Sequence, residues 1–250
     1  MLEKAYLINL KVILAHPDDS NRLLSALTQN ELPFVFIDES GLFTREQLSE
    51  KLYDYGFKGI YPELFYTSNM AAVDYVLQQD PNNLRAGYLG SAALKNALLT
   101  GGFQICQEHA DWLFLGLDRN DGYPDYCNGL QMIEQGAQMV ATNDEPIYSR
   151  RETKMIGAGA QTAMLEYASG RKALHIGMPQ PIIALCAMKY MGTSADNTIL
   201  VGDSVSKDIL CGNRAGMETV LISSDMSESA ELLKEVHPTY LVEDLNGLLR

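Results

Sequence analysis

The stretch from Ile199 to Gly216, ILVGDSVSKDILCGNRAG, constrains the fold more than any other part of the chain. An apolar run ends at Gly202 and is followed by two carboxylates, Asp203 and Asp208. Such a run is typical of a buried strand, and open α/β sheets bind ligands at the carboxyl ends of their parallel strands. Because hard cations such as magnesium prefer oxygen ligands, these two carboxylates also form a candidate cation site.

Short apolar runs alternate with helical patterns along the whole chain, which predicts βαβ units and a parallel sheet. Strands are expected at residues 6–14, 33–37, 64–67, 199–202 and 219–222, and in a separate group at 85–89, 112–117 and 138–142. The second group lies between a turn-rich entry and a Gly-Arg-Lys exit. We therefore expect residues 82–172 to form an inserted α/β domain, and residues 1–81 and 173–250 to form the domain around it.

Composition excludes several classes of protein. The net charge of −13 at pH 7 argues against nucleic-acid binding, which needs a basic face. No apolar stretch reaches the length that crosses a membrane. The four cysteines are far apart and form no CxxC pair, which favours a reducing compartment over disulfides or zinc. We expect a cytoplasmic protein with no nucleic-acid or membrane partner.

Several segments share their order and spacing with one known family. They are GLDRNDGYPDY, GAQMVATNDE, IGAGAQTAMLEYASGR, HIGMPQP and VGDSVSKDILCGNRAGMETVLI, preceded by the looser matches LINLKVIL, FVFIDESGLFTREQLSEKLYDYGF and FYTSNMAAVDYV. Together they resemble the haloacid dehalogenase-like (HAD) superfamily, subfamily IIA, in its NagD-type, p-nitrophenyl-phosphatase-like branch. The resemblance implies a Rossmann-like core with a parallel sheet, an inserted α/β cap of type C2, and magnesium-dependent phosphatase chemistry.

The resemblance also assigns roles to positions. In the family, the first aspartate of a D-x-D motif attacks phosphorus and the second protonates the leaving group. By alignment of the motifs, Asn9 and Lys11 stand at these two positions. An amide is a poor nucleophile, and a lysine ammonium with a reference pKa of ~10.4 is a weak acid at pH 7.

The phosphate-binding positions differ in the same way. Ile37 stands where the family has a threonine, and Met178 stands where it has a lysine. Neither side chain can bind a phosphate oxygen. Only Asp203 and Asp208 remain of the family's charged set, with Asp203 at a metal position. The alternative for both aspartates is structural: they cap the next helix and accept hydrogen bonds from loop amides.

Four concerted substitutions predict that phosphatase chemistry is lost. We expect a protein that binds a phosphorylated small molecule or a protein partner, with magnesium absent or weak and Lys11 paired with Asp203. The candidate ligand-binding residues are Asn9, Lys11, Ser40, Asn143, Asp203 and Asp208. The alternative is an active phosphatase of small sugar or nucleotide phosphate esters, as the family implies. The branch also implies a homodimer.

A second local pattern favours a different chemistry. Residues 15–19, AHPDD, resemble the start of the zinc-binding element of LmbE-type deacetylases. His16, Asp18 and Asp19 are therefore a further set of candidate metal ligands or acid/base groups. This is a third hypothesis, a metal-dependent hydrolase. Its structural alternative is a polar loop that opens the next helix.

Overall fold

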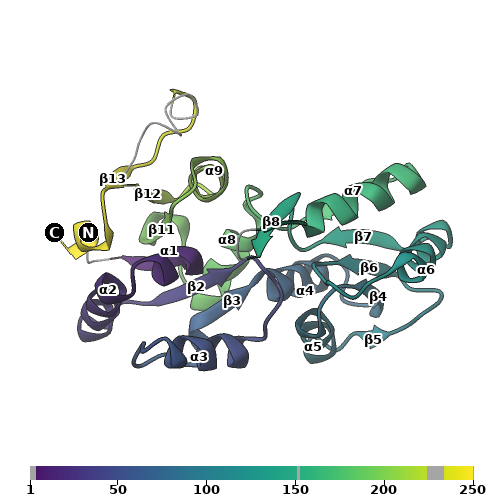
Figure 1. Ribbon diagram of the computed structural model, residues 1–250, viewed down its shortest axis with the longest axis horizontal. Coiled ribbons are helices and arrows are strands. Elements are labelled where there is room, and N and C mark those ends of the chain that lie inside the picture. Colours follow the sequence, from purple (N-terminus) through teal and green to yellow (C-terminus); the bar gives the residue numbers. More distant parts are fainter. Residues whose placement is uncertain (1–3, 151–152, 224–233, 250) are drawn as a thin grey trace. The chain divides into compact units, whose positions relative to one another are not determined.

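The computed structural model describes residues 4–150, 153–223 and 234–249. The chain divides into two compact units, each an α/β structure (Figure 1). Unit 1 comprises Met1–Asp38, Arg45–Tyr66 and Met178–Arg250, and unit 2 comprises Glu39–Thr44 and Thr67–Gly177. The α/β fold class is confirmed. The limits expected for an inserted domain, 82 and 172, both fall inside unit 2, and those limits stay a prediction.

Unit 1 is built on a six-stranded sheet with the order β13-β12-β11-β1-β2-β3. The strands are β1 Ala5–Asn9, β2 Phe34–Asp38, β3 Phe65–Thr67, β11 Thr198–Gly202, β12 Glu218–Ile222 and β13 Tyr240–Val242. The pairings of β1 with β11 and β2, and of β12 with β11 and β13, are parallel. The two central strands are buried along their whole length. The carboxyl ends of β1, β2 and β11 therefore meet at one edge of the sheet.

The helices of unit 1 follow the strands in the expected βαβ rhythm. They are α1 Leu10–Ala15, α2 Pro17–Gln29, α3 Arg45–Asp54, α8 Ile182–Met191 and α9 Leu210–Arg214, with 3₁₀ turns at Pro62–Leu64, Ala195–Asn197 and Leu245–Leu249 and a π-helix at Val205–Ile209. The helix expected from residue 208 to 215 is thus divided between the π-helix and α9. Among the described residues, no helix is long and apolar enough to cross a membrane.

The expected first strand, 6–14, is wrong in its second half. β1 ends at Asn9, and the helix α1 begins at Leu10. The physical reason is a helix cap: the Asn9 side chain accepts a hydrogen bond from the Lys11 backbone N–H at 3.0 Å. The apolar run continues because Val12 and Ile13 pack their side chains into the core from the helix. Lys11 therefore lies in the first turn of a helix, exposed to solvent.

Unit 2 has its own parallel five-stranded sheet, with the order β10-β7-β6-β4-β5. The strands are β4 Arg85–Leu89, β5 Gln104–Ile105, β6 Trp112–Leu115, β7 Gln138–Ala141 and β10 Leu174–His175, and the helices are α4 Ser68–Gln79, α5 Ala92–Thr100, α6 Tyr123–Glu134 and α7 Ala158–Ser169. The hairpin β8 Ile147–Arg150 with β9 Thr153–Ile156 is antiparallel and was not expected.

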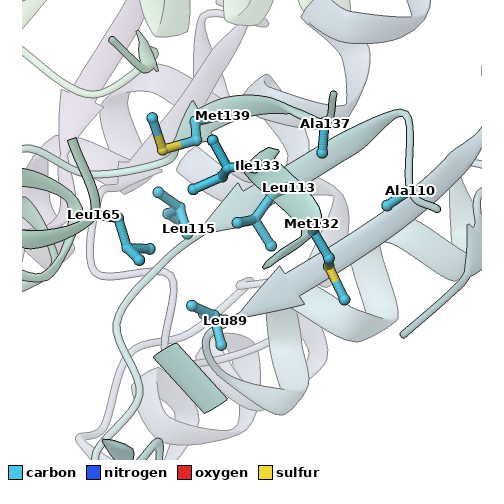
Figure 2. Close-up of a cluster of buried hydrophobic side chains, with 9 residues drawn as sticks. All are labelled: Leu89, Ala110, Leu113, Leu115, Met132, Ile133, Ala137, Met139 and Leu165. Carbon is cyan, nitrogen blue, oxygen red and sulfur yellow. The ribbon is translucent and has the colours of Figure 1, made fainter. Parts of the chain in front are cut away.

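One cluster of buried apolar side chains joins the sheet of unit 2 to two of its helices (Figure 2). The side chains come from β4, β6, β7, α6 and α7 and from the segments next to them. They are Leu89, Ala110, Leu113, Leu115, Met132, Ile133, Ala137, Met139 and Leu165. A shared core of this kind is what the alternating strand and helix pattern predicts.

Candidate functional site

The site of unit 1 lies at the carboxyl ends of β1 and β11, and its centre is a buried amide–carboxylate pair. Asn9, the last residue of β1, donates a hydrogen bond from Nδ2 to Asp208 Oδ1 at 2.7 Å. The Asn9 Oδ1 atom accepts the bond from the Lys11 N–H described above. Both ends of the amide are engaged, and the residue is 6% exposed. Sequence analysis did not predict this pair.

Asp208 is fully buried, with 0% exposure. Its second oxygen, Oδ2, accepts hydrogen bonds from the backbone N–H groups of Asp203 at 3.1 Å and Ser204 at 3.0 Å. Burial raises the pKa of Asp208 to about 6, the negative charge of Asp203 raises it further, and the hydrogen bond from Asn9 opposes the shift. The structural alternative for Asp208 is confirmed, because the carboxylate bonds loop amides.

The backbone around Asp208 is shaped to bring the carboxylate against the end of β11. A Cβ atom at Gly202 would overlap the carboxylate of Asp208, so only glycine fits there. Asp208 is carried by the π-helix, whose Val205 and Ile209 are buried against Leu221. Single π-turns are frequent at functional sites. The glycine and the apolar anchors together fix the buried carboxylate.

Asp203 and Lys11 are the exposed charges of the site. Asp203 follows the last residue of β11, and Lys11 follows the last residue of β1 by two positions. The carboxylate of Asp203 makes no hydrogen bond or ion pair to the described residues. The expected ion pair between Lys11 and Asp203 stays a prediction. The structure gives the buried carboxylate, Asp208, a neutral partner instead.

The two expected phosphate-binding positions are apolar and buried. Ile37 lies on β2 directly beside Asn9 in the parallel register, and it is 1% exposed. Met178 is 3% exposed and precedes a cis peptide bond to Pro179. Neither residue presents a polar side-chain atom to a ligand. Phosphate binding therefore has to come from other groups.

Ser40 and Asn143 belong to unit 2. The Asn143 side chain bonds the backbone at both ends, donating to the Glu39 carbonyl at 2.6 Å and accepting from the Glu145 N–H at 2.7 Å. The Ser40 hydroxyl accepts from the Leu42 N–H at 3.3 Å. These bonds show that both residues shape local backbone. Their expected role in ligand binding stays a prediction.

A tightly bound magnesium ion does not fit the residues at this edge of the sheet. Magnesium needs an octahedral set of oxygens, with one or two carboxylates among them. Asn9 Oδ1 and both oxygens of Asp208 already accept hydrogen bonds, which leaves Asp203 as the one unengaged carboxylate of the set. Within residues 4–150, 153–223 and 234–249, no group of three or more His, Cys, Asp or Glu side chains is placed to hold a metal.

That result also bears on the loop from His16 to Asp19. His16 lies between α1 and α2, and Asp18 and Asp19 occupy the first turn of α2. Asp19 contacts Arg22, one turn along the helix, at 3.9 Å. Acidic residues stabilise the first turn of a helix through its dipole. In the described structure this loop opens a helix, as its structural alternative predicts, and forms no metal centre.

Sequence analysis missed a second charged cluster, which lies in unit 2. His175 Nδ1 lies 2.6 Å from Asp144 Oδ1, and His175 Nε2 lies 3.3 Å from Glu166 Oε1. The hydrogen bond to Asp144 is the main reason that the pKa of His175 is raised. Lys172 pairs with the other oxygen of Glu166 at 2.9 Å. The partners of His175 are 9 and 31 positions away, so no local pattern announces the cluster.

The fold and the site define a class: a parallel α/β protein with carboxylates at the carboxyl ends of its central strands and a second α/β unit within its chain. The chain belongs to the haloacid dehalogenase-like superfamily, in its NagD-type, p-nitrophenyl-phosphatase-like branch. The family model described as HAD-hydrolase-like matches residues 175–248. Phosphatases of this family use magnesium.

Three relatives match nearly the full length. The 5′-nucleotidase YutF of Bacillus subtilis (strain 168) is 26% identical, over 97% of this chain and 96% of its own. The acid sugar phosphatase of Staphylococcus aureus (strain USA300) is 29% identical, over 97% and 95%. A solved structure of thermostable p-nitrophenylphosphatase from Bacillus stearothermophilus has a TM-score of 0.89 and 32% identity, over 97% and 96%.

These comparisons contradict our expectation of a protein that has lost phosphatase chemistry. All three relatives are named for the hydrolysis of phosphate esters, and the similarity is not confined to the cap or the sheet. Nothing in the comparisons indicates a relative without activity. The substitutions at Asn9, Lys11, Ile37 and Met178 therefore bear on how the site works.

Proposed function

We propose that the protein is a phosphatase that hydrolyses small phosphate monoesters, such as sugar or nucleotide phosphates. The observation that carries this proposal is the similarity over nearly the full length to three proteins named for that chemistry. The sheet topology supports it, since parallel α/β sheets bind their ligands where Asp203 and Lys11 are found.

The charges of the site support the same proposal. A phosphate monoester carries up to two negative charges, and phosphoryl transfer depends on their neutralisation. The lysine position of the family is the apolar Met178, whereas Lys11 adds an exposed ammonium where the family has a carboxylate. In our proposal Lys11 binds the phosphate oxygens in place of the lost lysine. Lysine is a well-used phosphate ligand in proteins.

Magnesium has a smaller role in this proposal than in the family. When bound, the ion would supply positive charge to the phosphate, with Asp203 as its protein carboxylate. The other two polar side chains of the site are engaged with each other and with backbone N–H groups. We therefore propose weak binding and a shallow dependence of the rate on magnesium concentration.

A substrate panel tests the proposed function. Release of inorganic phosphate is measured from p-nitrophenyl phosphate, hexose phosphates and nucleoside monophosphates, with magnesium and with EDTA. The site variant is Asp203→Asn, and its matched control is Asp196→Asn, the same change at an exposed aspartate before the other end of β11. We expect turnover that falls in the first variant and persists in the second. Equal rates in both variants, or no release above buffer, would reject the proposal.

A further inference from the structure

We infer that this chain transfers the phosphoryl group directly to water, without a phosphorylated protein as an intermediate, and that Asp203 holds the attacking water. This inference rests on the proposed phosphatase function. It departs from the aspartyl-phosphate route that the family resemblance implies. The argument proceeds by asking which side chain at the carboxyl edge of the sheet could attack phosphorus.

Asn9 cannot be the nucleophile. An amide oxygen is a poor nucleophile, and this one already accepts a hydrogen bond from the Lys11 N–H. The amide is held in place from its other end by the 2.7 Å bond to Asp208. At 6% exposure the residue forms a fixed, neutral floor of the site.

Asp208 cannot attack either. It is 0% exposed, and three N–H groups, one from the Asn9 side chain and two from the backbone, bond its oxygens. To reach a substrate it would have to leave all three donors unpaired in the protein interior, which is costly. Its position behind Asn9 makes Asp208 a positioning residue, which holds the amide and the loop of Asp203.

The two hydroxyl groups of the same loop are no better placed. Ser204 Oγ and Ser206 Oγ lie 3.4 Å apart and are bonded to each other. A serine nucleophile needs an adjacent general base within hydrogen-bond reach. No hydrogen bond joins either hydroxyl to a histidine or a carboxylate in the described parts of the chain.

Asp203 is the remaining polar group with free capacity. Its exposed carboxylate follows directly after β11, and β1 and β11 are paired in parallel with Ile8 beside Val201. The residues that follow these two strands therefore leave the sheet at the same edge. A carboxylate is a hydrogen-bond acceptor only, so it orients a water molecule with the oxygen lone pair directed away from it and toward a bound phosphate.

The step balances without a covalent protein species. The water oxygen forms a bond to phosphorus as the bond between phosphorus and the ester oxygen breaks. One proton of the water stays on the inorganic phosphate, and the other reaches the leaving oxygen through solvent. Catalysis comes from positioning of the water and from the charge of Lys11.

Rapid quenching with p-nitrophenyl [³²P]phosphate tests the inference. For the unaltered protein we expect no label on the protein during turnover and release of nitrophenolate without a burst. Asn9→Asp, which restores a carboxylate, is the positive control and should acquire a label that hydroxylamine removes. Label on the unaltered protein approaching one per chain, or a burst of that size, would overturn the inference. Resistance of such label to hydroxylamine would point to a serine.

Two further measurements keep the test decisive. If Asn9→Asp does not fold, the stereochemistry at phosphorus is measured on the unaltered protein with a chiral phosphate ester. Direct transfer predicts inversion, and retention would contradict it. Asp203→Asn should lower kcat on the order of 10²-fold, as removal of a positioned catalytic group does, and leave KM nearly unchanged. Phosphate release with a protein label rejects only this inference, whereas no phosphate release rejects the proposed function as well.

Discussion

Asn9→Asp places a second carboxylate against Asp208, at the 2.7 Å distance now spanned by an amide hydrogen bond. Two unit charges about 4 Å apart repel by about 4 kcal/mol at an effective dielectric constant of 20. The pair can avoid this by sharing one proton. Holding a proton on a carboxyl with a reference pKa of ~3.9 costs about 4 kcal/mol at pH 7 and about 1.5 kcal/mol at pH 5.

The sign of the pH dependence follows from linkage. The variant's folded-state pKa is raised above the unfolded value, so the folded state binds more protons. Its stability is present at low pH and is lost as the pH rises toward the raised pKa. We expect Asn9→Asp to lower the free energy of unfolding by about 4 kcal/mol at pH 7 and by about 1.5 kcal/mol at pH 5.

Urea unfolding at the two pH values, with and without magnesium, measures this. Asn197→Asp, at an exposed position of unit 1, is the control for the chemical change itself and should stay within about 0.5 kcal/mol of the unaltered protein. Magnesium should stabilise Asn9→Asp more than the unaltered protein, because the ion would then meet a third carboxylate. If Asn9→Asp is as stable as the unaltered protein at pH 7 without a divalent ion, the reasoning about the buried pair is refuted.

Three other outcomes are expected. Gly202→Ala should destabilise unit 1 by about 1–3 kcal/mol in urea unfolding, since a Cβ overlaps Asp208, and an unchanged midpoint would count against the packing described. The raised pKa of His175 stabilises the fold below about pH 6.5 and that contribution is lost as the pH rises, so His175→Gln should reduce the difference in thermal midpoint between pH 5.5 and pH 8. Because Lys11 replaces a general acid, turnover should depend steeply on the leaving group, with p-nitrophenyl phosphate hydrolysed faster than alkyl phosphates, and equal rates would show that an acid is present.

Periodicity and motif order predicted most of the fold. The strands at 85–89 and 199–202 and the helix at 158–169 were placed to within one residue, because long apolar runs and alternating patterns carry this information. The end of the first strand was not predicted. The apolar run through Ile13 has no break, and the helix begins there because one asparagine side chain caps it, a contact that composition does not show.

The site was predicted in its membership and not in its pairing. The register of the motifs brought Asn9, Ile37 and Asp208 to the same edge of the sheet, as expected. The bond between the first and last of these joins residues 199 positions apart, and only the packed sheet and the π-helix create it. Substitutions alone also misled the functional prediction, because they show which groups are gone and not which groups replace them.

The most direct test of the account is the initial rate of phosphate release from p-nitrophenyl phosphate by the unaltered protein and by Asp203→Asn, purified side by side and matched in thermal midpoint. The account predicts steady turnover by the unaltered protein and a rate on the order of 10²-fold lower for the variant. The account would be contradicted by equal rates, or by an unaltered protein that releases no phosphate above the buffer rate.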